Sequence, residues 1–243
     1  MSRELRVIPV EGLPEVEEGA KAGELIAARA DLEDGDIVVI SQKIVSKAEG
    51  QVRQLSAVEP SAPARELAAE HDKDPALVEL ILNESREVLR AERGVLITET
   101  HHGFVCANAG IDTSNLPEDS TVCLLPEDPD ASARRIRKEI SAAVVIADSF
   151  GRAWRLGQAE VAIGCAGLVP LDDWRGRTDT SRRELKATAI AVADQVAAAA
   201  DLVRSKDSGI PAAIVRGLGH YVTAEDGPGA VALRRPPAED LFR

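Results

Sequence analysis

Short apolar runs rich in β-branched residues alternate with longer amphipathic stretches along this chain, and no other feature constrains its fold more. These runs predict the following strands: Leu5–Pro9, Asp36–Ser41, Gly94–Thr98, Gly103–Ala107, Thr121–Leu125, Ala142–Ala147, Val161–Val169, Ala212–Arg216 and Ala230–Arg234. The alternation is typical of an α/β protein, so we expect the chemistry at strand ends and in the loops between strands.

Helical spacing is clearest after Asp74-Pro75, which places an N-cap residue before a proline at the first helical position. The helix predicted there carries these residues on one side: Leu77, Leu80, Ile81, Val88 and Leu89. A second helix is predicted from about Arg183 to Val203, a third is capped by Asp130, and a fourth covers Gly19–Ala30. No break in composition marks a domain linker.

The charge balance argues against nucleic acid as a partner. Lys and Arg number 29 against 41 Asp and Glu, which gives a formal net charge of −12 and a surface that repels a phosphate backbone. An aromatic share of 2% also leaves few side chains for stacking on bases. No stretch approaches the roughly 20 apolar residues of a membrane span, and the N-terminus is unlike a signal peptide, so we expect no membrane partner and a cytoplasmic location.

The cysteines and the common catalytic motifs exclude several site types. Cys106, Cys123 and Cys165 lie inside apolar runs and form no Cys-x-x-Cys pair, which predicts buried packing residues rather than a disulfide framework or a zinc site. The chain has no G-x-x-x-x-G-K-[ST], no G-x-G-x-x-G, no H-E-x-x-H and no G-x-S-x-G. The common nucleotide and hydrolase folds are therefore disfavoured.

A carboxylate and a hydroxyl follow the apolar run that ends at Ala147. Asp148 and Ser149 stand where nucleotide-dependent enzymes often present a magnesium ligand, at the end of a buried strand. Arg152 and Arg155 follow in what we expect to be the same loop, where guanidinium groups suit phosphates or carboxylates. The alternative is a surface turn with unpaired arginines, which we disfavour because charges of both signs converge after a buried strand.

A second polar segment follows the strand that ends at Ala107. Asp112 and Asn115 offer a carboxylate and an amide beside a glycine, a set that suits Mg²⁺ or Mn²⁺ with a polar ligand. An Asx turn that caps the loop explains the same residues equally well. The pattern alone does not choose between the two.

Two lysines follow the predicted strand that ends at Ser41. Lys43 and Lys47 in that position are suited to hold phosphate oxygens as point charges. Taken alone, the pair is better interpreted as solvated turn lysines. A further segment adds Arg175, Arg177 and Asp179 before the Ala-rich helix, and it is equally compatible with a solvated, salt-bridged loop.

The order and content of these segments resemble the coenzyme F-420 gamma-glutamyl ligases. The matching stretches span nearly the whole chain: Val10-Glu-Gly-Leu-Pro14, Val45-Ser-Lys-Ala-Glu-Gly50, Cys106-Ala-Asn-Ala-Gly-Ile-Asp-Thr-Ser-Asn115, Leu125-Pro-Glu-Asp-Pro-Asp130, Asp148-Ser-Phe-Gly-Arg152, Ala162-Ile-Gly164, Gly176-Arg-Thr-Asp179, Gly209-Ile-Pro211 and Val215-Arg-Gly217. The long Asn-Ala-Gly-Ile-Asp string is the most specific of them. By this resemblance we expect a mixed α/β fold, with helices packed on a mixed sheet, and not a P-loop or Rossmann fold.

The resemblance also implies the domain organisation and the assembly. We expect a single ligase unit over residues 1–243, with a division into two intertwined subdomains as the alternative, and no nitroreductase-like domain of the kind that some family members carry. A homodimer is implied by the family alone.

The resemblance further assigns roles to individual residues. Asp112 and Asp148 would hold a divalent metal ion, Mg²⁺ or Mn²⁺, and Ser149 would contribute to a second one. A monovalent cation, K⁺, is a further expected cofactor. The nucleotide GTP would contact the following residues: Leu13, Pro14, Glu15, Val16, Gln42, Lys43, Lys47, Asn115, Ser205, Lys206, Asp207 and Gly209. In some relatives the loop before Gly209 supplies an acidic metal ligand, and here Ser205, Lys206 and Asp207 are the alternatives for that position.

The reaction implied is the GTP-dependent joining of L-glutamate to the carboxylate of the deazaflavin precursor coenzyme F-420-0 through an acyl phosphate. The catalytic residues expected are Asp112, Asp148, Lys47 and Arg152, while Arg155 and Arg177 would orient the substrate. Two alternatives stand beside this reaction: a non-catalytic, metal-assisted nucleotide-binding module, and a ligase of the same mechanism that acts on another carboxylate.

Overall fold

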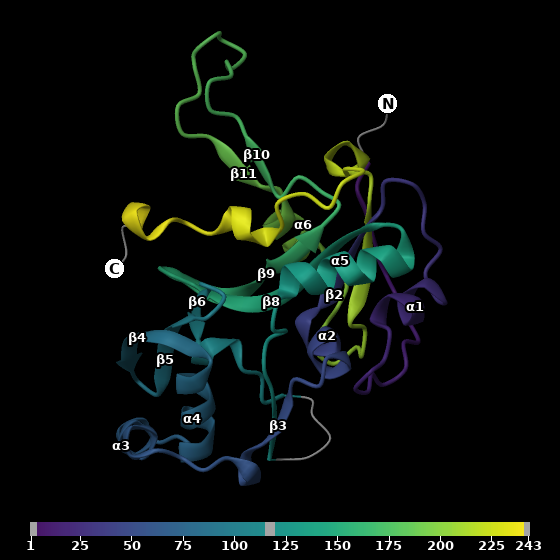
Figure 1. Cartoon of the computed structure of the whole chain (residues 1–243). Coiled ribbons are helices and arrows are strands. Elements are labelled where there is room, and N and C mark those ends of the chain that lie inside the picture. Colours follow the sequence, from purple (N-terminus) through teal and green to yellow (C-terminus); the bar gives the residue numbers. More distant parts are fainter. Residues whose placement is uncertain (1–3, 115–119, 241–243) are drawn as a thin grey trace.

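A mixed sheet of five strands forms the centre of the computed structural model, which describes residues 4–114 and 120–240 (Figure 1). In spatial order its strands are β1 (Arg6–Pro9), β12 (Ala212–Arg216), β2 (Ile37–Ser41), β8 (Ala143–Arg152) and β9 (Arg155–Ala166). Strands β2 and β8 are parallel, and the other neighbouring pairs are antiparallel. The predicted mixed α/β class is therefore confirmed.

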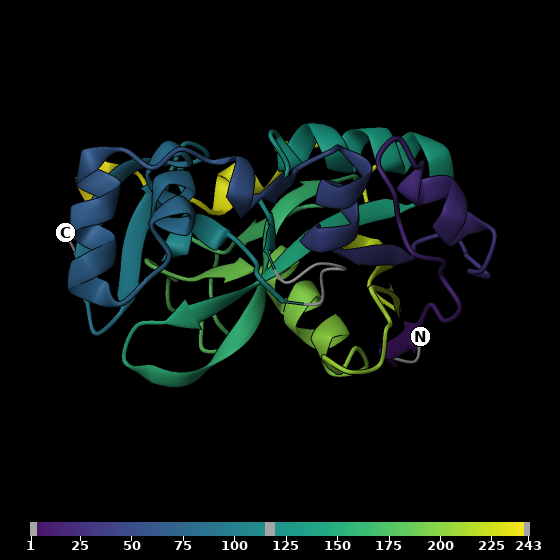
Figure 2. The same ribbon diagram turned by 90° about the horizontal axis from the view of Figure 1, so that it is seen from below.

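Helices cover both faces of this sheet, because its central strands are apolar on both sides. Val38 and Ile40 of β2 face α1 (Ala22–Ala27), α2 (Gln42–Ala48) and α5 (Pro129–Ile140). Ile37 and Val39 face α6 (Val192–Asp201) instead. Figure 2 shows α2 and α5 on one side of the sheet and α6 on the other.

A glycine lets α5 approach the sheet closely. A Cβ atom added at Gly164 of β9 would lie 2.3 Å from the carbonyl oxygen of Pro129, the first residue of α5. Any larger residue would push the helix away from the strand. The start of α5 is instead fixed by Asp128, whose side chain accepts a hydrogen bond from the Ala131 amide.

A smaller unit with its own core lies beside the sheet, between β3 (Val52–Gln54) and β7 (Thr121–Cys123) in the sequence. It consists of the 3-10 turn η1 (Leu55–Ala57), α3 (Ala62–His71), α4 (Pro75–Asn83), β4 (Ser85–Glu92), β5 (Val95–Thr100), β6 (Val105–Ala107) and η2 (Asn108–Gly110). Strands β4, β5 and β6 form a separate sheet, and β3 pairs with β7. The single ligase unit over residues 1–243 stays a prediction, as does its division into two intertwined subdomains.

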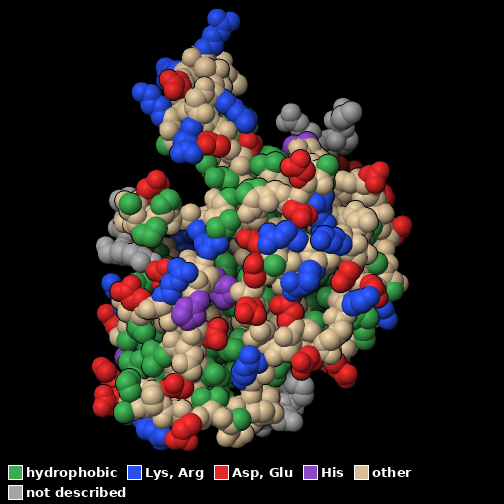
Figure 3. Space-filling view, in the orientation of Figure 1, with side chains coloured by type: hydrophobic (Ala, Val, Ile, Leu, Met, Phe, Trp, Pro, Cys, Tyr) green, Lys and Arg blue, Asp and Glu red, His purple; other side chains and the backbone are tan. Residues whose placement is uncertain are grey.

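Two hairpins project from the body. The ends of β8 and β9 curl away from the sheet in Figure 2, with Trp154 81% and Leu156 98% exposed at the tip. The second projection is an arm between β10 (Leu171–Asp173) and β11 (Ala189–Ala191), on which Lys and Arg side chains gather in Figure 3. The chain then ends in the 3-10 turns η3 (Gly219–Tyr221), η4 (Ala230–Leu233) and η5 (Pro237–Glu239).

Two predicted helices are shorter than their apolar spacing indicated. The helix that starts at Pro75 ends at Asn83, and Val88 with Leu89 belongs to β4, which pairs with β5 through a tight turn at the left-handed residues Arg93 and Gly94. The helix predicted from Arg183 begins only at Val192, because residues 174–188 form backbone hydrogen bonds across the arm instead.

Asp130 explains two further differences. It is not the N-cap of α5; its carboxylate accepts hydrogen bonds from the amides of Cys165 and Ala230. The hydrogen bond to Ala230 fixes the start of the 3-10 turn Ala230–Leu233, so the strand predicted over Ala230–Arg234 is wrong. The sequence patterns also missed α2, which begins directly after β2.

The three cysteines are buried and free, as predicted. Burial raises the pKa of Cys106 to about 12 and that of Cys123 to about 11, which makes both thiols poor nucleophiles. No helix in the described part of the chain is both long and apolar enough to cross a membrane.

Candidate functional site

A cavity of about 520 Å³ opens where β2 ends and α2 begins, next to the loop that precedes β12. Its lining comes from Leu13–Val16, helix α2, the segment from Cys106 to Ser114, the middle of β8, the facing part of β9, and the chain from the end of α6 to Pro211. Residues far apart in the sequence thus meet in one place. We refer to Glu15, Lys43, Lys47, Asp112 and Ser114 as the α2 wall, and to Asp148, Ser149, Glu160, Arg204 and Lys206 as the β8 wall.

The two lysines of the α2 wall line the cavity from one helix face. Lys43 and Lys47 are four residues apart on α2, a spacing that places both side chains on the same side of a helix. Lys43 Nζ lies 2.8 Å from Asp112 Oδ2, and Lys47 is paired with Glu15. Only 11% of the Lys47 side chain is exposed, so the interpretation as solvated turn lysines is wrong.

Asp112 is part of an Asx turn and also reaches a lysine in the cavity. Its Oδ1 accepts hydrogen bonds of 2.7 Å from both the amide and the hydroxyl of Ser114, while Oδ2 is left for Lys43. Burial by itself would raise the pKa of Asp112, but the hydrogen bonds from Lys43 and Ser114 hold it below the ordinary value. Asp112 therefore stays an ionised carboxylate at neutral pH. Asn115 lies outside the described residues.

Asp148 stands among like charges in the β8 wall. Burial raises its pKa to about 7, and the nearby carboxylates of Glu160 and Asp112 add to the effect. The structure also corrects the predicted loop: β8 continues to Arg152, so Asp148 and Ser149 lie within the strand, at the point where it leaves the buried sheet. The carboxylates of Glu160 and Asp112 raise the proton affinity of Asp148, so a cation is favoured beside it.

Glu160 was missed by the sequence analysis, because it lies eleven residues beyond Ser149 in a polar stretch with no recognisable motif. The antiparallel register of β8 and β9 places it directly opposite Ser149. Ser149 Oγ donates a 2.6 Å hydrogen bond to Glu160 Oε1, and Arg204 Nη2 lies 3.3 Å from Glu160 Oε2. The Glu160 and Arg204 side chains are only 7% and 5% exposed, so this is a buried ion pair.

The donors around Asp112 and Asp148 fit one divalent ion of the hard type. Mg²⁺ is usually bound through one or two carboxylates, with phosphate oxygens and water completing its shell. Within residues 4–114 and 120–240, no three His, Cys, Asp or Glu side chains come together as a ready-made metal cage. The carboxylate pair therefore suits an ion that arrives with a phosphate ligand.

Several predicted nucleotide contacts do line this cavity, and others do not. Those that line it are Leu13, Pro14, Glu15, Val16, Gln42, Lys43, Lys47, Ser205, Lys206 and Gly209. Gln42 is buried, and its side-chain oxygen accepts a hydrogen bond from Ser46 Oγ. Asp207 is not among the lining residues, and its carboxylate accepts a hydrogen bond from Ser205 Oγ.

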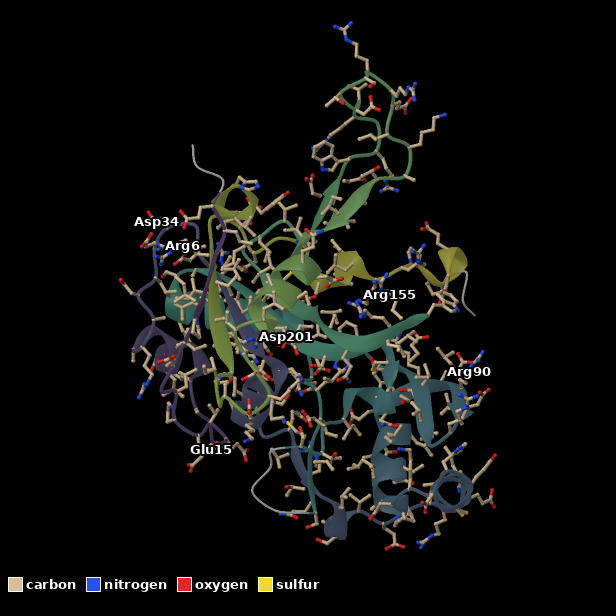
Figure 4. All side chains as sticks on the ribbon, turned by 180° about the vertical axis from the view of Figure 1, so that it is seen from behind. Arg6, Glu15, Asp34, Arg90, Arg155 and Asp201 are labelled. Carbon is tan, nitrogen blue, oxygen red and sulfur yellow. The ribbon has the colours of Figure 1, made fainter. Side chains whose placement is uncertain are left out.

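The three predicted arginines lie outside the cavity. Arg152 Nη2 donates to the Leu156 carbonyl oxygen near the tip of the β8–β9 hairpin. Arg155 is exposed on the same hairpin, and Figure 4 shows it apart from Glu15 and Asp201, which line the cavity. Arg177 lies on the arm, 3.3 Å from Asp172 and over the ring of Trp174. The segment with Arg175 and Arg177 thus forms ion pairs within the arm, as expected of the salt-bridged loop that the sequence allowed there.

A protein-family model described as F420-0:gamma-glutamyl ligase matches residues 12–217. The chain belongs to this family. The family named from the sequence motifs is thereby confirmed, and the matched range includes every residue that lines the cavity.

Relatives from this ligase family align with the chain over most of its length. The chain is 45% identical to the coenzyme F420:L-glutamate ligase of Methanothermobacter thermautotrophicus, an alignment that covers 98% of this chain and 99% of the relative. It is 44% identical to the protein of the same name from Methanopyrus kandleri, with 98% of each covered. The protein of that name from Methanocaldococcus jannaschii is 43% identical, with 90% of this chain and 88% of the relative covered.

Proposed function

We propose that this chain is a GTP-dependent ligase that joins L-glutamate to the carboxylate of coenzyme F-420-0 in coenzyme F-420 biosynthesis, and then adds gamma-linked glutamates. The observation that carries the proposal is a single cavity in which Lys43 and Lys47 face the carboxylates of Asp112 and Asp148. Membership of the gamma-glutamyl ligase family supports the choice of substrates. We also propose that the enzyme acts in the cytoplasm, a location that fits membership of a family of biosynthetic ligases.

The reaction needs activation of a carboxylate, because a free carboxylate would have to expel oxide. In the proposed first step a carboxylate oxygen of coenzyme F-420-0 attacks the γ-phosphorus of GTP. The bond between that phosphorus and the β,γ-bridging oxygen breaks, and GDP leaves. The amine of glutamate then attacks the acyl carbon, phosphate departs with the oxygen, and the amine loses its proton.

The lysines of the α2 wall would bind the triphosphate. Each now faces a carboxylate, and exchange of that partner for phosphate oxygens keeps each ammonium paired. Asp112 and Asp148 would hold Mg²⁺ or Mn²⁺, which supplies positive charge to the phosphate oxygens as the γ-phosphoryl group moves. K⁺ as a further cofactor rests on the resemblance alone.

The arginines predicted from the sequence, Arg152, Arg155 and Arg177, would act at the edge of the cavity. Arg152 and Arg155 lie on the hairpin that continues β8 and β9 out of the cavity wall. A role in substrate binding therefore requires the deazaflavin part of the precursor to extend along that hairpin. Arg177 would need the arm to reach the site from its present place.

We also propose a homodimer. The observation that favours a partner is the exposure of Trp154 and Leu156 at the tip of the projecting hairpin, since large apolar side chains gathered at one place mark interaction surfaces. Light scattering after gel filtration measures the mass of the assembly. A monomer at micromolar concentration would contradict the proposal.

The ligase activity is tested by incubating the chain with coenzyme F-420-0, GTP, L-glutamate and Mg²⁺. Mass spectrometry should detect the precursor extended by glutamate, together with GDP and phosphate. ATP in place of GTP, and omission of glutamate, are the controls. GTP binding without any product would favour the non-catalytic nucleotide-binding module, and GTP-dependent extension of a different acid would favour the ligase for another carboxylate.

A further inference from the structure

The side chains around Ser149 do not fit the second metal ion that the family resemblance implies there. Ser149 Oγ donates to Glu160 Oε1, and it accepts a 2.7 Å hydrogen bond from Lys206 Nζ. The same Nζ lies 3.8 Å from Glu160 Oε1. An ammonium group thus already contacts Ser149 Oγ, the oxygen expected to ligate the ion, and the carboxylate beside it, and it would repel a second cation.

Glu160 is fixed in this position independently of Lys206. Its other oxygen is paired with Arg204, which also donates to the carbonyl oxygens of Ala200 and Pro211. These contacts anchor Arg204 to the end of α6 and to the start of β12. The carboxylate that attracts Lys206 is therefore part of the rigid frame of the cavity.

Lys206 itself is a movable charge. Its side chain is 74% exposed, in contrast with the buried pair on which it rests. A lysine ammonium offers three donors on a flexible stem, so it can turn from Ser149 towards phosphate oxygens in the cavity without losing its place in the loop. Ser205 and Gly209, on either side of it, also line the cavity.

We propose that the Lys206 ammonium, held by Ser149 and Glu160, supplies the second positive charge of the active site in place of a second metal ion. The inference rests on the proposed GTP-dependent function. It assigns this chain one divalent ion, at Asp112 and Asp148, and one resident cation that is part of the protein.

Counting bound Mn²⁺ tests the proposal without turnover. The chain is mixed with Mn²⁺ and the β,γ-imido analogue of GTP, and free Mn²⁺ is measured by electron paramagnetic resonance. We expect one Mn²⁺ bound per chain at saturation. Two bound Mn²⁺ ions per wild-type chain would overturn the proposal.

Affinity for the same analogue tests the role of the ammonium. Lys206→Gln should weaken analogue binding about tenfold by calorimetry, since a charge-assisted hydrogen bond is lost. Lys206→Arg should bind more tightly than Lys206→Gln, and Lys186→Gln, which removes an exposed lysine from the arm, should match the wild type. Equal affinity of Lys206→Gln and the wild type would overturn the proposal.

These measurements distinguish a failure of the proposed GTP-dependent function from a failure of the role proposed for Lys206. A wild-type chain that does not bind the GTP analogue would refute the proposed function, and with it the role of Lys206. Normal binding accompanied by two Mn²⁺ ions would refute only the role of Lys206.

Discussion

The α2 wall and the β8 wall carry similar charges but hold them differently. In the α2 wall each lysine has a single carboxylate partner, and Glu15, the partner of Lys47, is 70% exposed. In the β8 wall Glu160 and Arg204 are paired out of reach of water, and Asp148 is left among like charges. Exposed pairs contribute little free energy, whereas a buried pair cannot lose one partner without a large cost.

The difference indicates a division of labour between the walls. The α2 wall can exchange its carboxylates for the phosphates of an incoming nucleotide, because Glu15 is exposed and each lysine stays paired with an anion in the exchange. The β8 wall keeps its shape and leaves Asp148 near the carboxylates of Glu160 and Asp112, an arrangement that favours a cation. Substitutions in the β8 wall should therefore change protein stability and metal binding, whereas substitutions in the α2 wall should change the affinity for GTP.

The largest effect is expected on stability, from breaking the buried pair. Arg204→Leu leaves the buried Glu160 carboxylate with the exposed Lys206 as its one cationic partner among the described residues, and it should lower the free energy of unfolding by about 3 kcal/mol. Arg65→Leu breaks an exposed pair with Glu59 and should cost less than about 1 kcal/mol. Urea denaturation measures both, and equal losses would show that the β8 wall is no more rigid than the surface.

The second effect is on activity, at Asp148. Asp148→Asn keeps the size of the side chain but removes the charge that would bind the metal, so ligation should fall about 100-fold or more. The rate of glutamate incorporation at saturating Mg²⁺ measures this. A near-normal rate would remove Asp148 from the site.

The same variant should gain stability in the metal-free protein. Because the folded pKa of Asp148 is raised to about 7, the wild type loses stability as pH rises from the unfolded value near 4. The Asn side chain has no such loss, so its advantage in melting temperature in EDTA should be larger at pH 8 than at pH 4. A constant difference across that range would contradict the assigned environment.

A smaller effect is expected at Lys47. Lys47→Ala should weaken GTP binding about tenfold, because a charged hydrogen-bond donor to the phosphates is lost. Calorimetric titration gives the affinity, with Lys186→Ala as the control from outside the cavity. If Lys47→Ala and the control have the same affinity, the α2 wall does not bind phosphate.

The smallest effect should come from Glu15, and it has the opposite sign. Glu15→Gln removes the carboxylate that competes with phosphate for Lys47, so GTP should bind about two- to threefold more tightly at low salt. The gain should fade as salt is added. Weaker GTP binding in this variant would show that Glu15 contacts the nucleotide itself.

Local patterns predicted much of this fold. The strands that surround the cavity were identified because β2 and the start of β8 are continuous apolar runs, as expected of strands buried on both faces. Helix α2 was missed because Gln42–Ala48 follows its strand without any loop, and its polar residues resembled a turn. Helix α6 was predicted too long because the backbone contacts of the arm compete with an Ala-rich stretch of helical spacing.

The residues of the candidate site likewise include some that the sequence identified and some that it did not. Asp112, Asp148 and the two lysines follow recognisable strands, which singled them out, but only the family resemblance assigned them to one site. Glu160 and Arg204 could not be found from spacing, because they meet only through the β8–β9 register and the end of α6. The arginines on the hairpin were expected in one loop with Asp148 because β8 was predicted to end at Ala147, whereas the strand continues to Arg152.

Transfer of oxygen from the substrate to phosphate tests the central claim most directly. The chain is incubated with GTP, L-glutamate, Mg²⁺ and coenzyme F-420-0 that carries oxygen-18 in its terminal carboxylate. Mass spectrometry then measures the oxygen-18 content of the phosphate and nucleotide products. An acyl phosphate requires the label to appear in inorganic phosphate, with GDP as the nucleotide product. Label in GMP, accompanied by pyrophosphate, would contradict γ-phosphoryl transfer even if the glutamylated product forms.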